Sequence, residues 1–219
     1  MASRPKQTAP RPAPRLYLTT PPISDASAFS VQLSSAMDVG DVAAVLLRLA
    51  DSDERTLINR AKTVATLVQD RGAALLLDGH VELVARAGAD GAHLNGIAAF
   101  SEALALLKPE RIAGAGGLTT RHDAMLAAEQ GADYVMFGEP DAAGARPAFD
   151  AIEDRISWWA EVFESPCVGY AASLDEIAPL VAAGADFIAL GDFLWRDPTA
   201  IKTATDEAFR LLQMPEPAA

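Results

Sequence analysis

Three predicted helix-to-strand junctions in this chain repeat almost the same four residues. A glycine ends each helix, because glycine adopts the left-handed backbone conformation without strain. A small residue follows the glycine, and an aspartate then opens the next strand. Three junctions of one kind predict a chain built from repeated strand–helix units. They are Ala87-Gly88-Ala89-Asp90, Gln130-Gly131-Ala132-Asp133 and Ala183-Gly184-Ala185-Asp186.

Eight short apolar runs alternate with segments of helical periodicity from Arg15 onward. Such runs are typical of buried parallel strands, and alternation with helices implies right-handed crossovers. Eight units in about 200 residues predict a single-domain α/β fold, a (β/α)8 TIM barrel over residues 15–213. No Gly-x-Gly-x-x-Gly follows the first run, which disfavours an open dinucleotide-binding sheet. The expected strands are Arg15–Thr19, Ala43–Leu49, Ala74–Leu77, Gly91–Leu94, Arg111–Gly114, Tyr134–Phe137, Cys167–Tyr170 and Phe187–Leu190.

Two helix starts carry recognisable capping signals. Asp53 precedes the second helical segment, where its carboxylate can accept backbone N–H groups. Ser173 precedes the seventh, and Glu176 three residues later completes the pattern of a capping box. We therefore expect helices to begin after Asp53 and after Ser173.

Both ends of the chain differ from the predicted barrel. Residues 1–14 contain four prolines, three basic side chains and no large apolar side chain apart from Met1, which predicts a disordered, Pro-rich basic arm. This arm lacks the apolar run of a secretory signal. It could grip an acidic partner or act only as a solubilising tail. Residues 214–219 are expected to be a frayed tail.

The charge balance restricts the classes of partner. Lys and Arg number 18 against 30 Asp and Glu, a formal net charge of −12, which argues against nucleic acid or an anionic membrane surface. No uninterrupted apolar run approaches the roughly 18 residues needed to span a bilayer. The single cysteine, Cys167, excludes an internal disulfide and fits a reducing compartment. These features predict a cytoplasmic protein.

Active sites of such barrels lie at the carboxyl ends of the strands, so polar residues there are the candidates. Asp78 follows an apolar run and precedes a glycine; its carboxylate could bind Mg²⁺ with substrate phosphate completing the ligands, act in acid–base chemistry, or cap a helix. His93 lies within the fourth strand, either as a buried neutral histidine with a backbone partner or as a catalytic group. Gly116, Gly117 and Thr119 could expose N–H groups to an anion or form only a tight turn.

Two further features concern packing. Cys167 opens the seventh strand at the end away from this site, which favours a buried structural thiol. Trp158 and Trp159 are adjacent on one helix and must point to different faces. One of them could contact a second subunit, so a homodimer is an expectation.

The chain resembles thiamine-phosphate synthase and the related thiazole tautomerases over about residues 15–200. The resemblance lies in 77–84, 88–94 and 131–138, supported by Tyr17-Leu18-Thr19-Thr20 and Gly184-Ala185-Asp186. It implies a (β/α)8 barrel that joins a pyrimidine pyrophosphate to a thiazole phosphate, with Mg²⁺ gripping the pyrophosphate. Through this resemblance Asp78 matches a metal-binding aspartate, and Arg48 and His93 match an arginine of the second strand and a histidine of the fourth.

Several motif positions of the family are substituted here. The family's Gln-Leu-Arg-x-Lys is Leu46-Leu47-Arg48-Leu49-Ala50, and the second metal-binding aspartate is missing from 95–98. The sixth-loop Thr-x-x-Lys is replaced within 141–146, which leaves Arg146 as the cation. The phosphate-binding diglycine after the seventh strand is Ala171-Ala172. We therefore expect a mouth that is acidic overall, with Arg48 and Arg146 facing Asp51, Asp53, Asp78, Glu139, Asp141 and Asp192.

Three functions remain open at this point. The first is a diverged thiamine-phosphate synthase that binds small phosphate esters, with Arg48, Asp78 and His93 as catalytic candidates. The second is a non-catalytic relative that binds a ligand or partner in the same cavity. The third is a different enzyme whose acidic mouth takes a cationic or neutral substrate. The substrate-binding candidates are Thr19, Asn95, Gly116, Gly117, Thr119, Glu139, Arg146, Tyr170 and Gly191.

Overall fold

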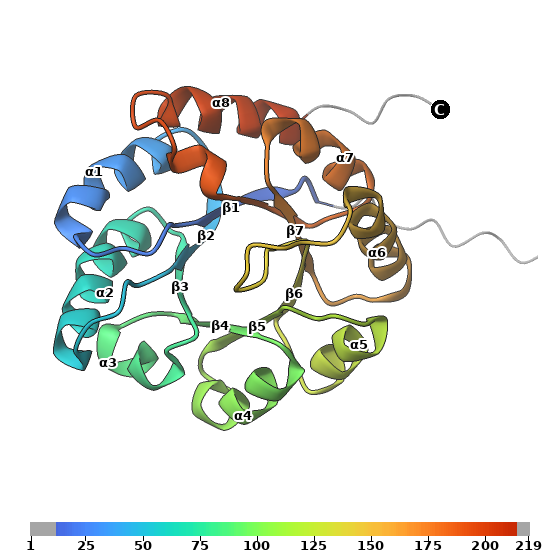
Figure 1. Cartoon of the computed structure of the whole chain (residues 1–219), viewed down its shortest axis with the longest axis horizontal. Coiled ribbons are helices and arrows are strands. Elements are labelled where there is room, and N and C mark those ends of the chain that lie inside the picture. Colours follow the sequence, from blue (N-terminus) through green and yellow to red (C-terminus); the bar gives the residue numbers. More distant parts are fainter. Residues whose placement is uncertain (1–11, 214–219) are drawn as a thin grey trace, which may run out of the picture.

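Eight parallel strands close into a barrel, and helical segments on the outside follow each strand (Figure 1). The computed structural model describes residues 12–213. This architecture confirms the predicted (β/α)8 barrel. The strands are β1 Arg15–Thr19, β2 Val42–Leu47, β3 Ala74–Asp78, β4 Gly91–Asn95, β5 Ile112–Gly116, β6 Tyr134–Phe137, β7 Cys167–Ala171 and β8 Phe187–Leu190.

The second strand is shorter than predicted. It ends at Leu47, and Leu49 instead forms an isolated parallel bridge with Ile23. The chain leaves the barrel ladder here, so Arg48 lies just beyond the strand rather than within it. This displacement places the Arg48 side chain at the barrel opening.

The helices differ in length and in how they begin. Asp53 caps α2 as predicted, accepting the N–H of Thr56 at 3.0 Å. The predicted capping box at Ser173 is wrong, because Ser173 makes no capping hydrogen bond and Glu176 contacts Arg146 instead. The helices are α1 Ala26–Met37, α2 Glu54–Gln69, α3 Val84–Ala87, α4 Ile97–Leu107, α5 Arg121–Glu129, α6 Phe149–Val162, α7 Ile177–Ala182 and α8 Ile201–Leu212; 3-10 turns η1 Val81–Leu83, η2 Leu174–Glu176 and η3 Asp192–Trp195 precede α3, α7 and α8.

The repeated Gly-Ala-Asp junctions fasten pairs of strands together. Their glycines, Gly88, Gly131 and Gly184, all have left-handed backbones, as predicted. Each aspartate carboxylate accepts the N–H of a residue at the start of the neighbouring odd-numbered strand. The pairs are Asp90 with Leu75 at 2.7 Å, Asp133 with Ala113 at 2.7 Å, and Asp186 with Cys167 at 2.8 Å. The repeat therefore satisfies otherwise unpaired donors at the amino ends of β3, β5 and β7.

Two apolar clusters make up the core. The larger lies between the strands and the helices and contains Trp159 and Cys167, both fully buried. The smaller fills the barrel interior and includes Tyr17, Tyr134 and Tyr170. Trp158 packs within its own chain, 5.4 Å from the Phe163 ring centroid to centroid. The predicted homodimer stays a prediction.

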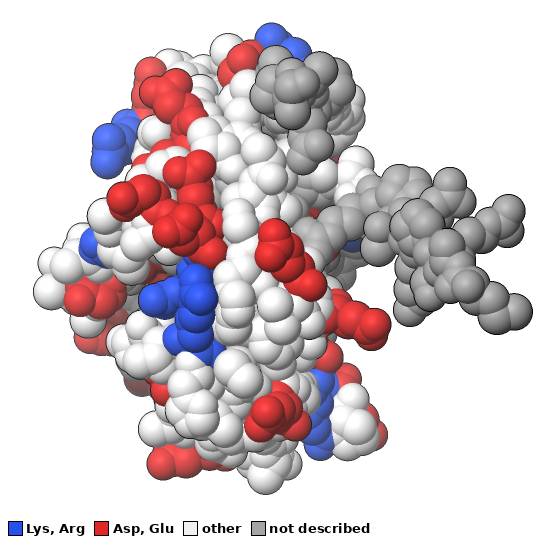
Figure 2. All heavy atoms as spheres, turned by 90° about the vertical axis from the view of Figure 1, so that its right-hand side faces the viewer, with Lys and Arg blue, Asp and Glu red and all other residues white. Residues whose placement is uncertain are grey.

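The surface carries the excess negative charge expected from the composition. Figure 2 shows acidic side chains spread over the side that lies at the right in Figure 1, with fewer basic ones among them. Within residues 12–213, no helix has the length and apolar character to cross a bilayer. The predicted arm at 1–14, apart from 12–14, and the tail at 214–219 lie outside the described residues.

Candidate active site at the barrel mouth

Two adjoining cavities open at the carboxyl ends of the strands, each about 410 Å³ in volume. The loop between β6 and α6 reaches over the barrel opening (Figure 1), and its residues line both cavities. We call them the central cavity, which contains Arg48, and the lateral cavity, which extends toward α6. They share a wall formed by Asn95, Met136, Glu139, Pro140 and Asp141.

Most of the predicted site residues do meet here. The central cavity is lined by Thr19, Arg48, Asp78, His93, Asn95, Glu139 and Tyr170; the lateral cavity is lined by Asn95, Gly117, Thr119, Glu139 and Arg146. Gly116 and Gly191 line neither cavity. Of the acidic residues expected at the mouth, Asp51 and Asp53 also lie outside both linings.

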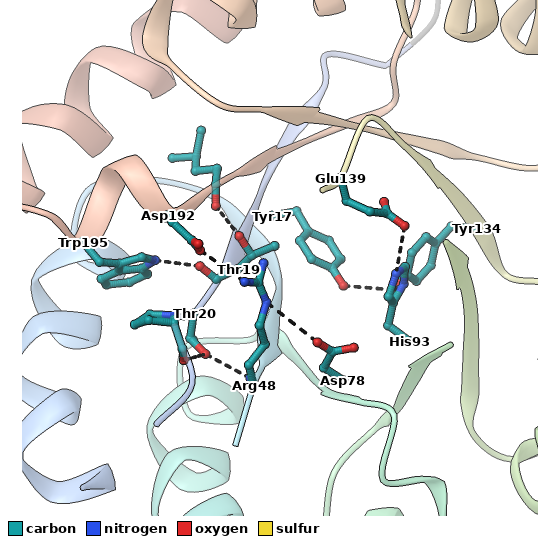
Figure 3. Close-up of polar contacts among 12 residues, drawn as sticks. Tyr17, Thr19, Thr20, Arg48, Asp78, His93, Tyr134, Glu139, Asp192 and Trp195 are labelled. Carbon is teal, nitrogen blue, oxygen red and sulfur yellow. Dashed lines mark hydrogen bonds and ion pairs between the residues drawn. The ribbon is translucent and has the colours of Figure 1, made fainter. Parts of the chain in front are cut away.

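Arg48 lies between two carboxylates from opposite parts of the chain (Figure 3). Its Nε is 3.8 Å from Asp78 Oδ2, and its Nη1 is 3.2 Å from Asp192 Oδ1. The backbone N–H of Arg48 donates to the Thr20 hydroxyl at 3.0 Å, which fixes the start of the side chain. Two carboxylates of the protein thus already neutralise the Arg48 guanidinium.

His93 is buried inside the barrel, but its partner is not the backbone group that was expected. Its Nδ1 lies 3.0 Å from the Tyr134 hydroxyl, which lies 2.9 Å from the Tyr17 hydroxyl. Its Nε2 lies 3.7 Å from Glu139 Oε1, an ion-pair distance. These side chains form a line from Tyr17 to Glu139 (Figure 3). Burial raises the pKa of both tyrosines, so both phenols stay neutral.

The glycines at the end of β5, Gly116 and Gly117, leave room for side chains rather than for a substrate anion. The Gly117 N–H donates to the Glu139 carboxylate, so that donor is already used. A Cβ at Gly116 would lie 2.0 Å from Glu139 Oε1, and one at Gly117 would lie 1.8 Å from Asn95 Oδ1. Glycine is therefore required at both positions for Glu139 and Asn95 to lie where they do. Oε2 of Glu139 is buried, and no described residue bonds it.

The N–H groups at the start of α5 are also partly used. Thr120 and Asp123 form a full capping box, in which the Asp123 carboxylate accepts the Thr120 N–H at 2.9 Å. The Thr119 hydroxyl also donates to that carboxylate, at 3.1 Å. An anion approaching Thr119 would meet this negative group, which weakens the expected anion site.

Arg146 is held by neighbouring loops. Its Nη1 lies 2.9 Å from both carboxylate oxygens of Glu176, its Nε donates to Gly138 O, and its Nη2 donates to Tyr170 O. Glu176 also accepts the Ala172 N–H at 2.8 Å. The backbone donor at the substituted diglycine is therefore taken by an internal carboxylate.

Thr19 and Gly191 act in packing. The Thr19 hydroxyl donates to Leu190 O at 2.6 Å, and its carbonyl accepts the Trp195 indole N–H at 2.6 Å. A Cβ at Gly191 would lie 2.3 Å from the Tyr170 hydroxyl. These residues set the position of β1 and β8 beneath the cavity.

The described residues contain no group of three or more His, Cys, Asp or Glu side chains arranged to hold a metal ion. Asp78 fits the requirement of Mg²⁺ for one protein oxygen completed by substrate oxygens, because it lines the central cavity and 37% of its side chain is exposed.

Sequence reasoning missed Tyr17, Tyr134, Glu176 and Arg155. The two tyrosines stand at inward positions of predicted strands, so strand alternation could have placed them beside His93. The spacing of Glu176 from Ser173 predicts a capping box rather than the observed ion pair with Arg146. Arg155 lies on α6, where no strand-end argument would find it.

Comparison with known proteins identifies one family. Residues 16–194 match the family model described as thiamine monophosphate synthase. Thiamine-phosphate synthase of Rhodospirillum centenum is 39% identical over 202 residues, covering 91% of this chain and 98% of that protein. The enzyme of the same name from Hyphomonas neptunium is 37% identical, covering 93% of this chain and 97% of its own. The solved structure of thiamine phosphate pyrophosphorylase from Pyrococcus furiosus superposes with a TM-score of 0.72 at 20% identity, covering 91% of this chain and 95% of that one, and shares the fold.

Proposed function

This chain belongs to the thiamine monophosphate synthase family, and we propose that it joins a pyrimidine pyrophosphate to a thiazole phosphate. The observation that carries this proposal is the pairing of Arg48 with Asp78 in the central cavity, at 3.8 Å. These are the two residues that the family resemblance assigns to the pyrophosphate. Curated relatives covered over nearly their whole length support the same activity.

In this reaction the thiazole nitrogen forms a bond to the methylene carbon of the pyrimidine, and the bond from that carbon to the pyrophosphate oxygen breaks. The protein must hold the two rings together and stabilise the leaving pyrophosphate. Arg48 supplies positive charge for the leaving group. Asp78 would hold Mg²⁺, which when bound supplies further charge at the same oxygens.

His93 has a supporting part in this proposal. Its Nδ1 is held by the Tyr134 hydroxyl at 3.0 Å, and its Nε2 faces the Glu139 carboxylate at 3.7 Å. The side chain is 4% exposed, so it forms the floor of the central cavity. We assign His93 to positioning Glu139 and shaping this floor. Small phosphate esters are the proposed ligands, and the cytoplasm remains the proposed location.

A second candidate function is a non-catalytic relative that binds a ligand in the same cavities. It is favoured by the internal carboxylates, because Glu139 and Glu176 occupy the N–H groups of Gly117 and Ala172. Glu176 also neutralises Arg146. A protein with this arrangement would bind phosphate esters weakly unless Mg²⁺ or another cation compensates.

Calorimetric titration with the pyrimidine pyrophosphate, with and without Mg²⁺, tests the proposal. We expect micromolar binding in the presence of Mg²⁺ and loss of that Mg²⁺ dependence in Asp78→Ala. Asp51→Asn removes an exposed carboxylate outside both cavity linings and should behave as the unchanged protein. Absence of binding at millimolar ligand would remove the proposed activity and leave the second candidate.

A further inference from the structure

Four side chains that can carry positive charge line the two cavities, and three of them face carboxylates of their own chain. Arg48 pairs with Asp78 and Asp192, His93 faces Glu139, and Arg146 pairs with Glu176. The fourth, Arg155, lines the lateral cavity. Across residues 12–213 it makes no ion pair within 4.0 Å, and its side-chain hydrogen bonds go to neutral carbonyl oxygens. Arg155 is therefore the uncompensated cation of the mouth.

The guanidinium of Arg155 is held in a fixed place. Its Nη1 donates to Leu118 O at 2.8 Å, and its Nη2 donates to Thr119 O at 3.2 Å. Its Cζ lies 6.0 Å from the centroid of the Phe137 ring. A guanidinium has five N–H donors, so three remain after these two bonds. An oriented arginine with spare donors is suited to a phosphate group, which it can bind through two parallel hydrogen bonds.

The lateral cavity has the size and lining of a small-molecule site. Its volume of about 410 Å³ falls within the range of ligand pockets, roughly 300–1,000 Å³. Its polar and charged lining residues besides Arg155 are Asn95, Thr119, Glu139, Asp141 and Arg146. The apolar side chains are Leu118, Met136, Phe137, Pro140 and Pro147. The apolar side chains suit a small aromatic ring, and the unpaired Arg155 guanidinium suits an anionic group attached to that ring.

Other anion donors at the mouth are less available. The Ala172 N–H, at the substituted diglycine, is bound to Glu176, and the Gly117 N–H is bound to Glu139. A phosphate at either position would have to displace a carboxylate of like charge. Arg155 itself pairs with no carboxylate among the described residues, although Asp123 lies beside Thr119 and Glu139 and Asp141 line the same cavity.

We propose that Arg155 binds the phosphate monoester of the thiazole substrate, with the ring against the apolar wall of the lateral cavity. This inference rests on the proposed function, which supplies the thiazole phosphate as a substrate. The two cavities adjoin at Asn95, Met136 and Glu139, so this ring would lie next to a pyrimidine in the central cavity. Arg155 is then a specificity-determining residue that lies on α6, outside the family motifs named above.

The test compares two ligands that differ by one group, the thiazole phosphate and its unphosphorylated alcohol, by calorimetric titration. Arg155→Gln should weaken binding of the phosphate about 10- to 100-fold, the effect of losing a charge-assisted pair, and leave the alcohol unchanged. Arg155→Lys keeps the positive charge and should lose less affinity for the thiazole phosphate than Arg155→Gln does. Arg121→Gln is the matched control, because Arg121 is a surface arginine that stacks on Trp158 at 4.7 Å and lies outside the cavity.

Each outcome decides between the two claims. If Arg155→Gln binds the thiazole phosphate as tightly as the unchanged protein does, the assignment of Arg155 is overturned. It is also overturned if the variant loses the same affinity for the thiazole phosphate and for the alcohol. Both results leave the proposed function standing. If the unchanged protein binds neither thiazole, the proposed function fails. Titration with inorganic phosphate then decides on the anion site alone: weakening in Arg155→Gln but not in Arg121→Gln supports it, and no difference overturns it.

Discussion

The Arg146 guanidinium and the Glu176 carboxylate form a close ion pair, with Arg146 Nη1 2.9 Å from both carboxylate oxygens. Four-fifths of each side chain is buried. The pair joins the β6–α6 loop to the turn after β7, because Arg146 also donates to Gly138 O and Glu176 accepts the Ala172 N–H. One ion pair thus fixes two of the loops that shape the cavities.

Removal of Glu176 should destabilise the fold. Glu176→Gln leaves a largely buried guanidinium without its counter-charge, and we expect a loss of about 2–3 kcal/mol in the free energy of unfolding, measured by urea denaturation. Asp175→Asn changes the exposed neighbouring carboxylate and should cost less than 0.5 kcal/mol, roughly the usual range for surface changes. Adding Arg146→Gln to Glu176→Gln should recover part of the loss; a purely additive double variant would contradict the coupling.

Asp192 should oppose the binding of anions. It lies 3.2 Å from Arg48 and is half exposed, so its charge competes with a pyrophosphate for the same guanidinium. In Asp192→Asn, affinity for the pyrimidine pyrophosphate without Mg²⁺ should rise about 3- to 10-fold, as read by calorimetry. Asp197→Asn removes an exposed charge from the same segment, where the carboxylate contacts Thr199, and should leave the affinity unchanged. A fall in affinity in Asp192→Asn would show that this carboxylate helps to bind the ligand.

The two buried tyrosine hydroxyls should differ in importance. Within residues 12–213, the Tyr134 hydroxyl lies within hydrogen-bond distance of both Tyr17 and His93, whereas the Tyr17 hydroxyl has only Tyr134 as a hydrogen-bond partner. Tyr134→Phe therefore deprives two buried polar groups of the Tyr134 hydroxyl, and should lower the free energy of unfolding by about 2–3 kcal/mol. Tyr17→Phe should lower it by about 1 kcal/mol. Equilibrium unfolding in urea measures both. Equal costs would mean that the His93 contact contributes nothing.

Stability should decline at high pH because of these tyrosines. Burial raises the pKa of Tyr17 and Tyr134 above the ordinary value of 10.0, so the folded protein keeps both protons while the unfolded chain releases them. Their contribution to stability is fully present below pH 10 and is lost progressively as the pH rises above it. Tyrosinate absorbance should therefore increase together with loss of circular dichroism. Ionisation of all three tyrosines in the still-folded protein would contradict this.

The barrel could be predicted because its signals are local. Left-handed glycines end three helices and apolar runs mark the strands, so the number and order of the strands follow from the chain alone. The end of β2 at Leu47 could not be predicted, because the apolar run continues to Leu49. Leu49 pairs with Ile23 outside the barrel strands, and this contact is not visible in the sequence.

The membership of the site could also be predicted, but the partners of its residues could not. Strand ends place Arg48, Asp78 and His93 at one opening in any barrel of this order. The ion pairs depend on how side chains from distant parts of the chain are oriented across the barrel opening. Examples are the pairs of Arg48 with Asp192 and of Arg146 with Glu176. Glu176 illustrates the difficulty, because its spacing from Ser173 fits a local cap and the distant arginine competes successfully for it.

Product formation tests the account most directly. The protein is incubated with the pyrimidine pyrophosphate, the thiazole phosphate and Mg²⁺, and thiamine phosphate is quantified after oxidation to its fluorescent derivative. We predict steady turnover that falls at least about 100-fold in Asp78→Ala and in Arg48→Ala, since each removes charge stabilisation of the leaving group, and that persists in Asp51→Asn. No product from the unchanged protein, with both substrates bound, would contradict the proposed activity.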